Sequence, residues 1–563
     1  MGFRHSRTVS SGFVLIEVAL VVAALVSGCS GGGDTGSGGN GITTDPTAGS
    51  GGEGSAGTSA AVAGTGGQSL GSANAGSGGG PDAPAADGGV MGNQDGGLGP
   101  WDLGTAIPAQ SQEPGDAQAG YQYLTNAGYF GCGVPARFFG LVRPFATLPG
   151  IPNEPLAGRS VSVDNQPLGY NWNLAKNSDG IDVVYMNCLQ CHAGKFNGKL
   201  LIGLGNADAD WTQNLGGAAG ASNLLGALLP TPQEQKELDK FIGRLKVIGD
   251  PAVMKTVGTN PAEMLATTFV AHRDRATLAW SDTALLHISA LDTAPKGTII
   301  TSKTPPWWRM AKKNAQFYNG MGRGDHRRSE MLAGSLCTDT VDQANAIDAH
   351  FKDVSAYIRT VKAPSYPFAI DHALADKGKA VFNDSCAGCH GTYASEASND
   401  AGDTYPNLFI PQAEIQTDPA VGLGGTTVEY GSALVDWYNQ SWYGEVGHYE
   451  PASGYVAPPL DGVWATAPYL HNGSVPDIAT LLDSTKRPKY WRRMDHDTTH
   501  YDERGLGFPW MELTSGQAAP PLGVAARDIY DSTQYSHGNG GHTYGDSLSG
   551  DQRAAVLEYL KTL

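Results

Sequence analysis

Apolar residues recur at helical spacing in several segments of the chain, and glycine- and proline-rich stretches separate these segments. Apolar side chains three or four positions apart lie on one face of a helix and can be buried together. The stretches between the segments predict loops. The first four predicted helices cover residues 116–127, 232–248, 261–278 and 344–361.

A further pair of helices is predicted in the last third of the chain. Asp371 is placed to cap the first of them, and Ser549 with Gln552 forms a capping-box pattern at the start of the second. On the first helix the apolar positions four apart are Leu374, Gly378 and Phe382. On the second the apolar positions are Val556, Leu557, Leu560 and Leu563.

A separate apolar run lies close to the N-terminus, well before the first predicted helix. Its position and its flanking residues predict a targeting segment. Arg4 and Arg7 precede the run at residues 13–26, and Cys29 follows it in a sequence that looks like a lipobox. Residues 1–29 are therefore predicted to be a lipoprotein signal peptide, with Cys29 as the lipidated residue.

Another reading of the same segment stays open. Residues 12–17 resemble the cleavage motif of type IV prepilins, and Glu17 is an unusual charge inside a secretory apolar run. Both readings export the chain. We expect it at the outer membrane or cell surface, anchored by lipid, with the periplasm and full secretion as alternatives.

Composition separates the N-terminal part from the rest. Residues 30–98 are a tract of glycine, serine and alanine that lacks the apolar residues needed for a core, so they are predicted to be a disordered tether. The whole chain carries a formal net charge of -18, which argues against binding to nucleic acid or to an anionic membrane surface.

Two Cys-x-x-Cys-His motifs carry the candidate chemistry. Two thiols three positions apart can each bond a vinyl group of one haem, and the adjacent histidine can bind its iron. The alternatives are a zinc site and a redox-active Cys-x-x-Cys, but neither needs a histidine directly after both second cysteines. The motifs predict two covalently bound haem c groups. The attachment residues are Cys188 and Cys191 with His192, and Cys386 and Cys389 with His390.

The second motif directly follows a predicted helix, as in cytochrome c. In that fold the first and last helices cross, so residues 371–563 look like one haem domain with a long insertion. The fold class predicted for the chain is mainly α with many loops, built from two cytochrome c-like haem domains with long insertions. Their predicted extents are residues 99–365, which would bind oxygen, and residues 366–563.

Two further cysteines lie outside the motifs. In an exported protein Cys132 and Cys337 can form a disulfide, and two buried free thiols are the alternative.

The sixth ligand of each iron decides between electron transfer and catalysis. His542 lies among glycines just before the last helix and is the predicted sixth ligand of the second haem, with His537 and His471 as rivals. No similar candidate stands out for the first haem. Its distal side is therefore predicted to be open, which makes His192 the centre of the predicted active site.

Together these residues resemble the bacterial dihaem cytochrome c peroxidase superfamily and, within it, the rubber oxygenases. The resemblance runs from about residue 101 to residue 563. Its Ala-Pro-Tyr-Leu-His-Asn-Gly-Ser sequence supports the superfamily. The basic stretch at residues 312–325 and the 198 residues between the two motifs favour the rubber oxygenases. The stretches that carry it are residues 187–206, 305–325 and 455–476, with Gly541-His542 and residues 558–561.

This resemblance implies a function. The first haem would bind dioxygen, and a C=C bond of poly(cis-1,4-isoprene) would be cleaved to aldehyde and ketone ends. Phe317 would cover the oxygen-binding face, and Trp307 or Trp308 would lie between the haems. The second haem, held by His390 and His542, would tune or reduce the first, and an external electron donor would supply it.

Two departures and two alternatives accompany the resemblance. The best-known rubber oxygenases are freely secreted, whereas this chain has a lipobox and a tether. Related dihaem proteins oxidise unsaturated fatty acids, which also bring a cis alkene to an apolar channel. A hydrogen peroxide-dependent peroxidase is the other alternative, and it requires a polar acid or base near the open iron.

Overall fold

Helices form where the apolar spacing predicts them. The computed structural model describes residues 103–143, 154–214, 216, 229, 231–289, 291, 299–396, 400–424, 426 and 431–563. Five predicted helices are confirmed almost to the residue, and the segment predicted at 261–278 is helical only as far as Ala271. The α-helices are α2 (Ala117–Asn126), α3 (Ala136–Val142), α4 (Leu189–His192), α6 (Pro232–Gly249), α7 (Ala262–Ala271), α9 (Arg327–Met331), α10 (Val341–Thr360), α11 (His372–Ser385), α12 (Ala387–His390), α13 (Gln412–Ile415), α14 (Pro419–Gly424), α15 (Gly431–Asn439), α16 (Ile478–Leu481) and α17 (Gly550–Leu560). The 3-10 helices are η4 (Trp307–Lys312), η5 (Leu332–Cys337), η6 (Trp442–Glu445), η7 (Val463–Ala465), η8 (Ser484–Lys486), η9 (Ala526–Asp528) and η10 (Tyr544–Ser547).

The predictions for the signal peptide, the lipobox and the tether concern residues 1–98 and lie outside the described residues. Within the described ranges, no helix combines the length and the apolar character that crossing a membrane requires.

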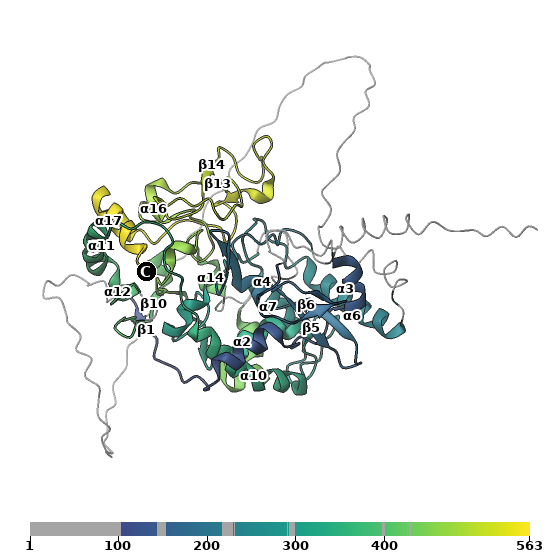
Figure 1. Cartoon of the computed structure of the whole chain (residues 1–563). Coiled ribbons are helices and arrows are strands. Elements are labelled where there is room, and N and C mark those ends of the chain that lie inside the picture. Colours follow the sequence, from purple (N-terminus) through teal and green to yellow (C-terminus); the bar gives the residue numbers. More distant parts are fainter. Residues whose placement is uncertain are drawn as a thin grey trace, which may run out of the picture. The chain divides into compact units, whose positions relative to one another are not determined.

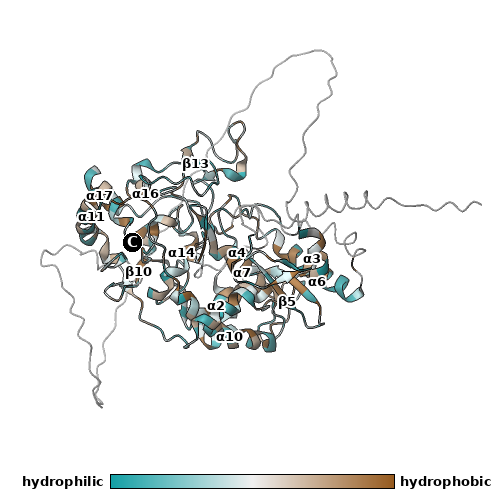
Figure 2. Ribbon diagram, viewed as in Figure 1, coloured by the Kyte–Doolittle hydropathy of each residue, from teal (hydrophilic) through white to brown (hydrophobic). Residues whose placement is uncertain are grey.

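Helices α11 and α17 pack against each other, as predicted (Figure 1). The Asp371 side chain caps α11, and Ser549 with Gln552 forms a complete capping box on α17. The contact is close because Gly378 has no side chain, since a Cβ there would overlap the backbone carbonyl of Ala555. Hydrophilic (teal) and hydrophobic (brown) residues alternate along the ribbons of the longer helices, such as α10 (Figure 2).

The prediction of a mainly α fold is wrong. Only 38% of the described residues are helical, and six small antiparallel sheets of two or three strands lie between the described helices. Most of the strands are two to five residues long, which is too short for an alternating apolar pattern to stand out in the sequence. The strands are β1 (Thr105–Ala106), β2 (Val134–Pro135), β3 (Ser162–Val163), β4 (Gln166–Pro167), β5 (Trp172–Lys176), β6 (Asp182–Met186), β7 (Ala193–Phe196), β8 (Lys199–Ile202), β9 (Gly322–Gly324), β10 (Leu408–Pro411), β11 (Gly447–Tyr449), β12 (Gly454–Val456), β13 (Tyr490–Arg493), β14 (Trp510–Glu512) and β15 (Tyr530–Asp531).

The prediction of two cytochrome c-like domains is not supported either. All described residues belong to one compact unit. The sheet β1-β10-β12 and the sheet β9-β11 each join strands from both predicted domains. The core around α11 and α17 also contains Phe196 and Trp308 from the first predicted domain. Apolar residues from distant segments share these cores, and sequence spacing carries no information about such pairing.

Cys132 and Cys337 form a disulfide, with their Cα atoms 5.0 Å apart. This answers the question that the sequence left open. The bond joins the segment before β2 to the end of η5 inside a large apolar core that also contains Trp307.

Candidate haem-binding sites

The first motif is held at the end of strand β6. The Asn187 side chain accepts a hydrogen bond from the backbone N–H of Leu189 at 2.9 Å and donates one to the Tyr170 carbonyl at 2.8 Å. These bonds fix the short helix α4, which begins after Cys188 and ends at His192. The tight hairpin of β7 and β8 follows directly, with Gly198 in the left-handed region at its turn.

The His192 ring stacks on Trp307. Their ring centroids are 4.9 Å apart and their planes differ by 20°. The loop after the motif makes this contact possible, because a Cβ at Gly205 would overlap the Thr304 carbonyl and the N–H of Trp307 donates to the Gly203 carbonyl at 2.8 Å. Two of the glycines that follow the motif therefore bring the chain against the segment that contains Trp307.

His192 is buried in a form that could bind a metal. Burial lowers the pKa of His192 to about 4, while the neighbouring Pro305 carbonyl acts in the opposite direction. The imidazole is therefore neutral near pH 7, as an iron ligand must be.

The second motif follows α11 without a break. Cys386 ends α11, and α12 carries the motif to His390. The Nδ1 atom of His390 lies 2.7 Å from the Pro458 carbonyl, so it carries the proton and leaves Nε2 free. Such a bond from the second ring nitrogen to a carbonyl is typical of metal-binding histidines. Burial also lowers the pKa of His390.

A large apolar cavity adjoins the second motif. It contains about 1510 Å³ of empty space, including the part that opens to solvent. Cys386, Cys389 and His390 line it, together with His542. The apolar side chains of the lining include Leu103, Phe382, Ile410, Ile415, Val456, Leu460, Val463, Leu470, Ile478, Leu481, Leu482, Val556 and Leu560. A cavity of this chemistry fits a flat, apolar macrocycle.

His542 faces His390 across this cavity. Their ring centroids are 6.1 Å apart. Two nitrogens on opposite sides of one metal ion are roughly 4 Å apart, since metal–imidazole bonds are about 2 Å long, and the two rings add the remaining distance. Burial lowers the pKa of His542 to about 3, so it too is neutral, and its Nδ1 has no hydrogen-bond partner among the described residues.

The backbone of His542 is held in an unusual conformation. Its φ is +46°, in the left-handed region that non-glycine residues seldom adopt. The Arg487 guanidinium donates to the carbonyls of Asn539, Gly541 and His542 at 2.7 to 2.9 Å. The N–H of His542 donates to the Ile415 carbonyl at 2.9 Å. These contacts point the imidazole into the cavity.

The two rival histidines differ from His542. His471 also lines the cavity, but its Nε2 lies 3.1 Å from the Tyr455 hydroxyl, and the two rings stack at 4.4 Å. His537 is buried outside the cavity lining, and its Nδ1 is 2.8 Å from the Tyr535 carbonyl. The geometry favours His542, and its role as sixth ligand stays a prediction.

Cationic side chains in this cavity were not predicted from the sequence. Arg309 and Lys303 both line it, and the buried Nε of Arg309 has no hydrogen-bond partner among the described residues. A haem propionate would provide a partner for it. Lys303 donates to the carbonyls of Thr466 and Pro468, and burial lowers its pKa to about 7.

The four motif thiols do not suit the alternatives to haem. Burial raises the pKa of Cys188 to about 11, of Cys191 to about 12 and of Cys386 to about 11, and it raises that of Cys389 as well. A redox-active thiol needs a lowered pKa. In the described part of the chain, His, Cys, Asp and Glu side chains nowhere gather in threes to hold a metal ion, as a zinc site would require.

The aromatic residues predicted near the first haem occupy two different cores. Trp307 belongs to the core around the first motif, and Trp308 to the core of α11 and α17, where its Nε1 donates to the Asp461 carbonyl at 2.7 Å. Phe317 packs on the first core with its edge toward Tyr449, at 5.6 Å between centroids. Its φ is +66°, so the backbone of Phe317 lies in the left-handed region, as that of His542 does.

Two enclosed carboxyl groups near the first motif were also missed. Glu263 lies in the first turn of α7, which begins just after Asn260, a residue hydrogen-bonded to Cys191. Burial alone raises the pKa of Glu263 to about 7, and no described residue donates a hydrogen bond to its carboxyl group. Glu330 has a pKa of about 7 for the same main reason, and its Oε2 is buried without a described partner. An acidic residue in a first helical turn usually stabilises the helix, so no sequence pattern indicates another role for Glu263.

Comparison with known proteins agrees with this chemistry. Residues 454–492 match a cytochrome c-like family, which suggests covalently bound haem c and a haem-dependent function. That family is described as RoxA-like, so the match supports a RoxA-like protein. The matched residues include Tyr455 and His471 of the cavity lining.

Two relatives come from Sinorhizobium fredii (strain NBRC 101917 / NGR234), and both are named only as uncharacterised proteins. The protein y4iJ is 33% identical over 262 residues, which cover 37% of this chain and 41% of the relative. The protein y4iM is 29% identical over 238 residues, which cover 37% of this chain and 53% of the relative. The chain thus spans about half the length of these relatives or less.

Proposed function

We propose that this protein is an exported dihaem c dioxygenase that oxidises C=C bonds of an apolar substrate, with poly(cis-1,4-isoprene) as the first candidate and an unsaturated fatty acid as the second. The supporting observation is the difference between the two motif histidines. His390 faces a second histidine, His542, whereas the ring stacked on His192 is Trp307. On this proposal His542 would close the second iron, and the first iron would keep an open position.

The residues around the first motif would perform distinct tasks. A haem c bound to Cys188, Cys191 and His192 would supply an iron that can activate dioxygen. His192 would bind the iron in its neutral form, which burial favours by lowering its pKa to about 4. Phe317 would present an apolar face to the alkene, which has no group that accepts a hydrogen bond and must be bound by burial.

The tandem tryptophans would connect the two sites. Trp307 stacks on His192, and Trp308 packs in the core that surrounds the second motif. Electrons from an external donor would enter at the second haem and reach the first through this pair. The proposal also includes export and attachment to a membrane through Cys29, which follow from the sequence alone.

Oxygen consumption tests the proposed reaction. Purified protein is incubated in air with polyisoprene latex or with oleate, in the absence of peroxide. We expect oxygen uptake with carbonyl or hydroperoxide products, and the substrate that supports it separates the two candidates.

Replacing Phe317 with Ala should lower the rate by about tenfold, since apolar burial of a large side chain contributes a few kcal/mol. Phe139→Leu is the matched control, because Phe139 is buried in a separate cluster. Absence of oxygen uptake with every alkene would contradict the proposal.

The alternative function is a peroxide-dependent activity, and the partly buried carboxyl group of Glu263 favours it. A carboxyl with a pKa near 7 can donate and accept a proton at neutral pH, as peroxide cleavage requires. If the protein is a peroxidase, Glu263→Gln should lower peroxide turnover by about 10²- to 10⁴-fold. Under the dioxygenase proposal the same variant retains oxygen uptake.

A further inference from the structure

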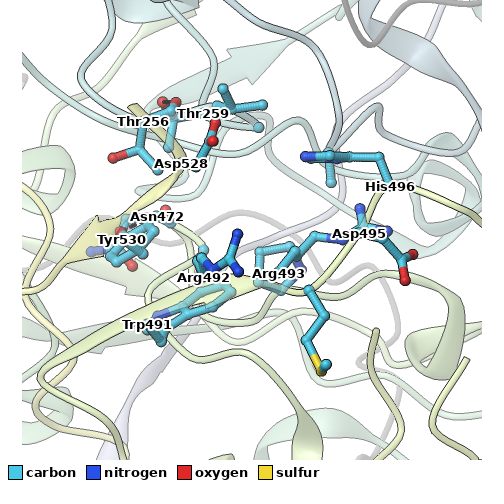
Figure 3. Close-up of a pocket in the computed structure, with 16 residues that line it drawn as sticks. Thr256, Thr259, Asn472, Trp491, Arg492, Arg493, Asp495, His496, Asp528 and Tyr530 are labelled. Atoms are coloured by element: carbon cyan, nitrogen blue, oxygen red, sulfur yellow. Dashed lines mark hydrogen bonds between the residues drawn. The ribbon is translucent and has the colours of Figure 1, made fainter. Parts of the chain in front are cut away.

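A second pocket lies outside both motif regions, and we name it the arginine pocket after Arg492 and Arg493. It contains about 690 Å³ of empty space, including the part open to solvent. Thr256, Thr259 and Asp528 lie on one side, and Trp491 with the two arginines lies on the other (Figure 3). The arginines come from strand β13 and the opposite wall from residues 256–259 and η9.

The guanidinium of Arg492 has no ionic or hydrogen-bonding partner among the described residues. Its Nε is buried, and its side chain reaches the pocket from β13. A buried donor without a partner costs about 1–3 kcal/mol, more when it is charged, so such a group is a strong reason to expect a ligand or ordered water.

Arg493 carries two further donors without a described partner, and both atoms are buried in the wall of the pocket. Its side chain is 10% exposed, its Nη1 pairs with Asp208, and its Cζ lies 3.9 Å from the Phe508 ring centroid. The Nε and Nη2 atoms, which form the edge that binds a carboxylate or phosphate with two parallel bonds, have no described partner.

The other charges around the pocket are mostly engaged elsewhere. Asp208, beside the pocket, also accepts from His496 at 2.9 Å, and Asp495 is 3.0 Å from a ring nitrogen of His500. Asp528 is the exception, because no described residue donates to its carboxylate, and it faces the arginines without forming an ion pair with them (Figure 3). The free positive charge lies on the β13 side, and the free negative charge lies across the pocket.

We propose that the arginine pocket binds a small oxyanion, a carboxylate or a phosphate, through the guanidinium groups of Arg492 and Arg493. Asp528 opposes this binding by repulsion and weakens it. The site is separate from both motifs, although its walls continue into them: Thr259 precedes Asn260, which contacts Cys191, and Asn472 follows His471 of the second cavity. The proposal does not depend on the proposed function.

The test uses the purified, haem-loaded full-length protein. Inorganic phosphate and acetate are titrated separately at low chloride by isothermal calorimetry, and the melting temperature is followed in parallel. We expect saturable 1:1 binding of one of these anions and a rise in melting temperature. The anion that binds more tightly distinguishes a phosphate site from a carboxylate site.

Three variants make the test specific. Arg492→Gln should weaken binding by about 10- to 100-fold, the value of a charged hydrogen bond, and Asp528→Asn should tighten it several-fold. Arg504→Gln removes an exposed arginine elsewhere and should change nothing. The proposal is overturned if neither anion binds, if Arg492→Gln binds as the parent protein does, or if Asp528→Asn weakens binding. Circular dichroism of each variant separates loss of the site from loss of the fold.

Discussion

The two Cys-x-x-Cys-His motifs have the same attachment chemistry, but their surroundings differ. The second motif lines a large apolar cavity that also contains the side chains of Lys303 and Arg309. Among the described residues, no Asp or Glu lines this cavity. Near the first, two enclosed carboxyl groups, Glu263 and Glu330, have a pKa of about 7. The comparison teaches that the motif fixes where a haem is bonded, while distant segments decide what its iron can do.

The partners of the two histidines show the same difference. His390 faces His542, whose left-handed backbone forms two hydrogen bonds, one from its N–H to the Ile415 carbonyl and one from Arg487 to its own carbonyl. His192 stacks on Trp307 instead, and the left-handed residues in or against its core are the apolar Leu278 and Phe317. A residue held in a sparsely populated backbone conformation often serves a function.

Removal of the attachment cysteines has the largest expected effect. Cys188→Ala with Cys191→Ala should remove the haem of the first motif, and Cys386→Ala with Cys389→Ala that of the second. The haem content of each double variant, measured as the pyridine haemochrome, should fall to about half. Equal haem content in a double variant and the parent protein would show that the motif does not bind haem.

Loss of His542 should come next. His542→Ala should convert the second haem from low spin to high spin and change its visible spectrum, since a six-coordinate iron loses one ligand. His471→Ala is the matched control in the same cavity and should leave the spin state unchanged. A reversal of these two results would assign the ligand to His471.

The raised pKa of Glu263 predicts that the free energy of unfolding depends on pH. Its folded pKa is raised from 4.5 to about 7, so its neutral form is favoured in the folded state. The stability it contributes is fully present below pH 4.5 and is lost as the pH rises through about 7. Glu263→Gln should therefore be more stable than the parent by about 2–3 kcal/mol at pH 8 and equal to it near pH 4. Urea unfolding at both pH values measures this, and an equal difference at both would refute it.

Each haem region contains one glycine that allows two segments of the chain to pack closely. Gly378→Ala would overlap the Ala555 carbonyl between α11 and α17, and Gly205→Ala would overlap the Thr304 carbonyl next to Trp307. Each should cost about 1–3 kcal/mol of unfolding free energy, as overpacking does. The first should disturb only the spectrum of the second haem, and the second only that of the first. Gly550→Ala has open space around its Cβ and serves as the control.

Local patterns predicted five of the six helices closely. The Asp371 cap and the Ser549–Gln552 capping box depend on residues near one another in sequence. Such features are visible in a linear chain.

The features that the sequence did not reveal depend on contacts across long distances. Strand β10 pairs with β1 from far upstream, and the Pro458 carbonyl reaches His390 across 68 positions. Arg309 faces the cavity of the second motif although it precedes that motif by many positions in the sequence. Glu263 acquires its unusual pKa from burial alone, which no local pattern encodes.

Titration of the fully reduced protein with carbon monoxide tests the central claim most directly. Carbon monoxide binds a ferrous haem only where a coordination position is open or its ligand is easily displaced. With two haems bound per chain, the account predicts about one carbon monoxide per chain, and none after Cys188→Ala with Cys191→Ala. Binding of two molecules per chain, or binding that survives the loss of Cys188 and Cys191, would contradict it.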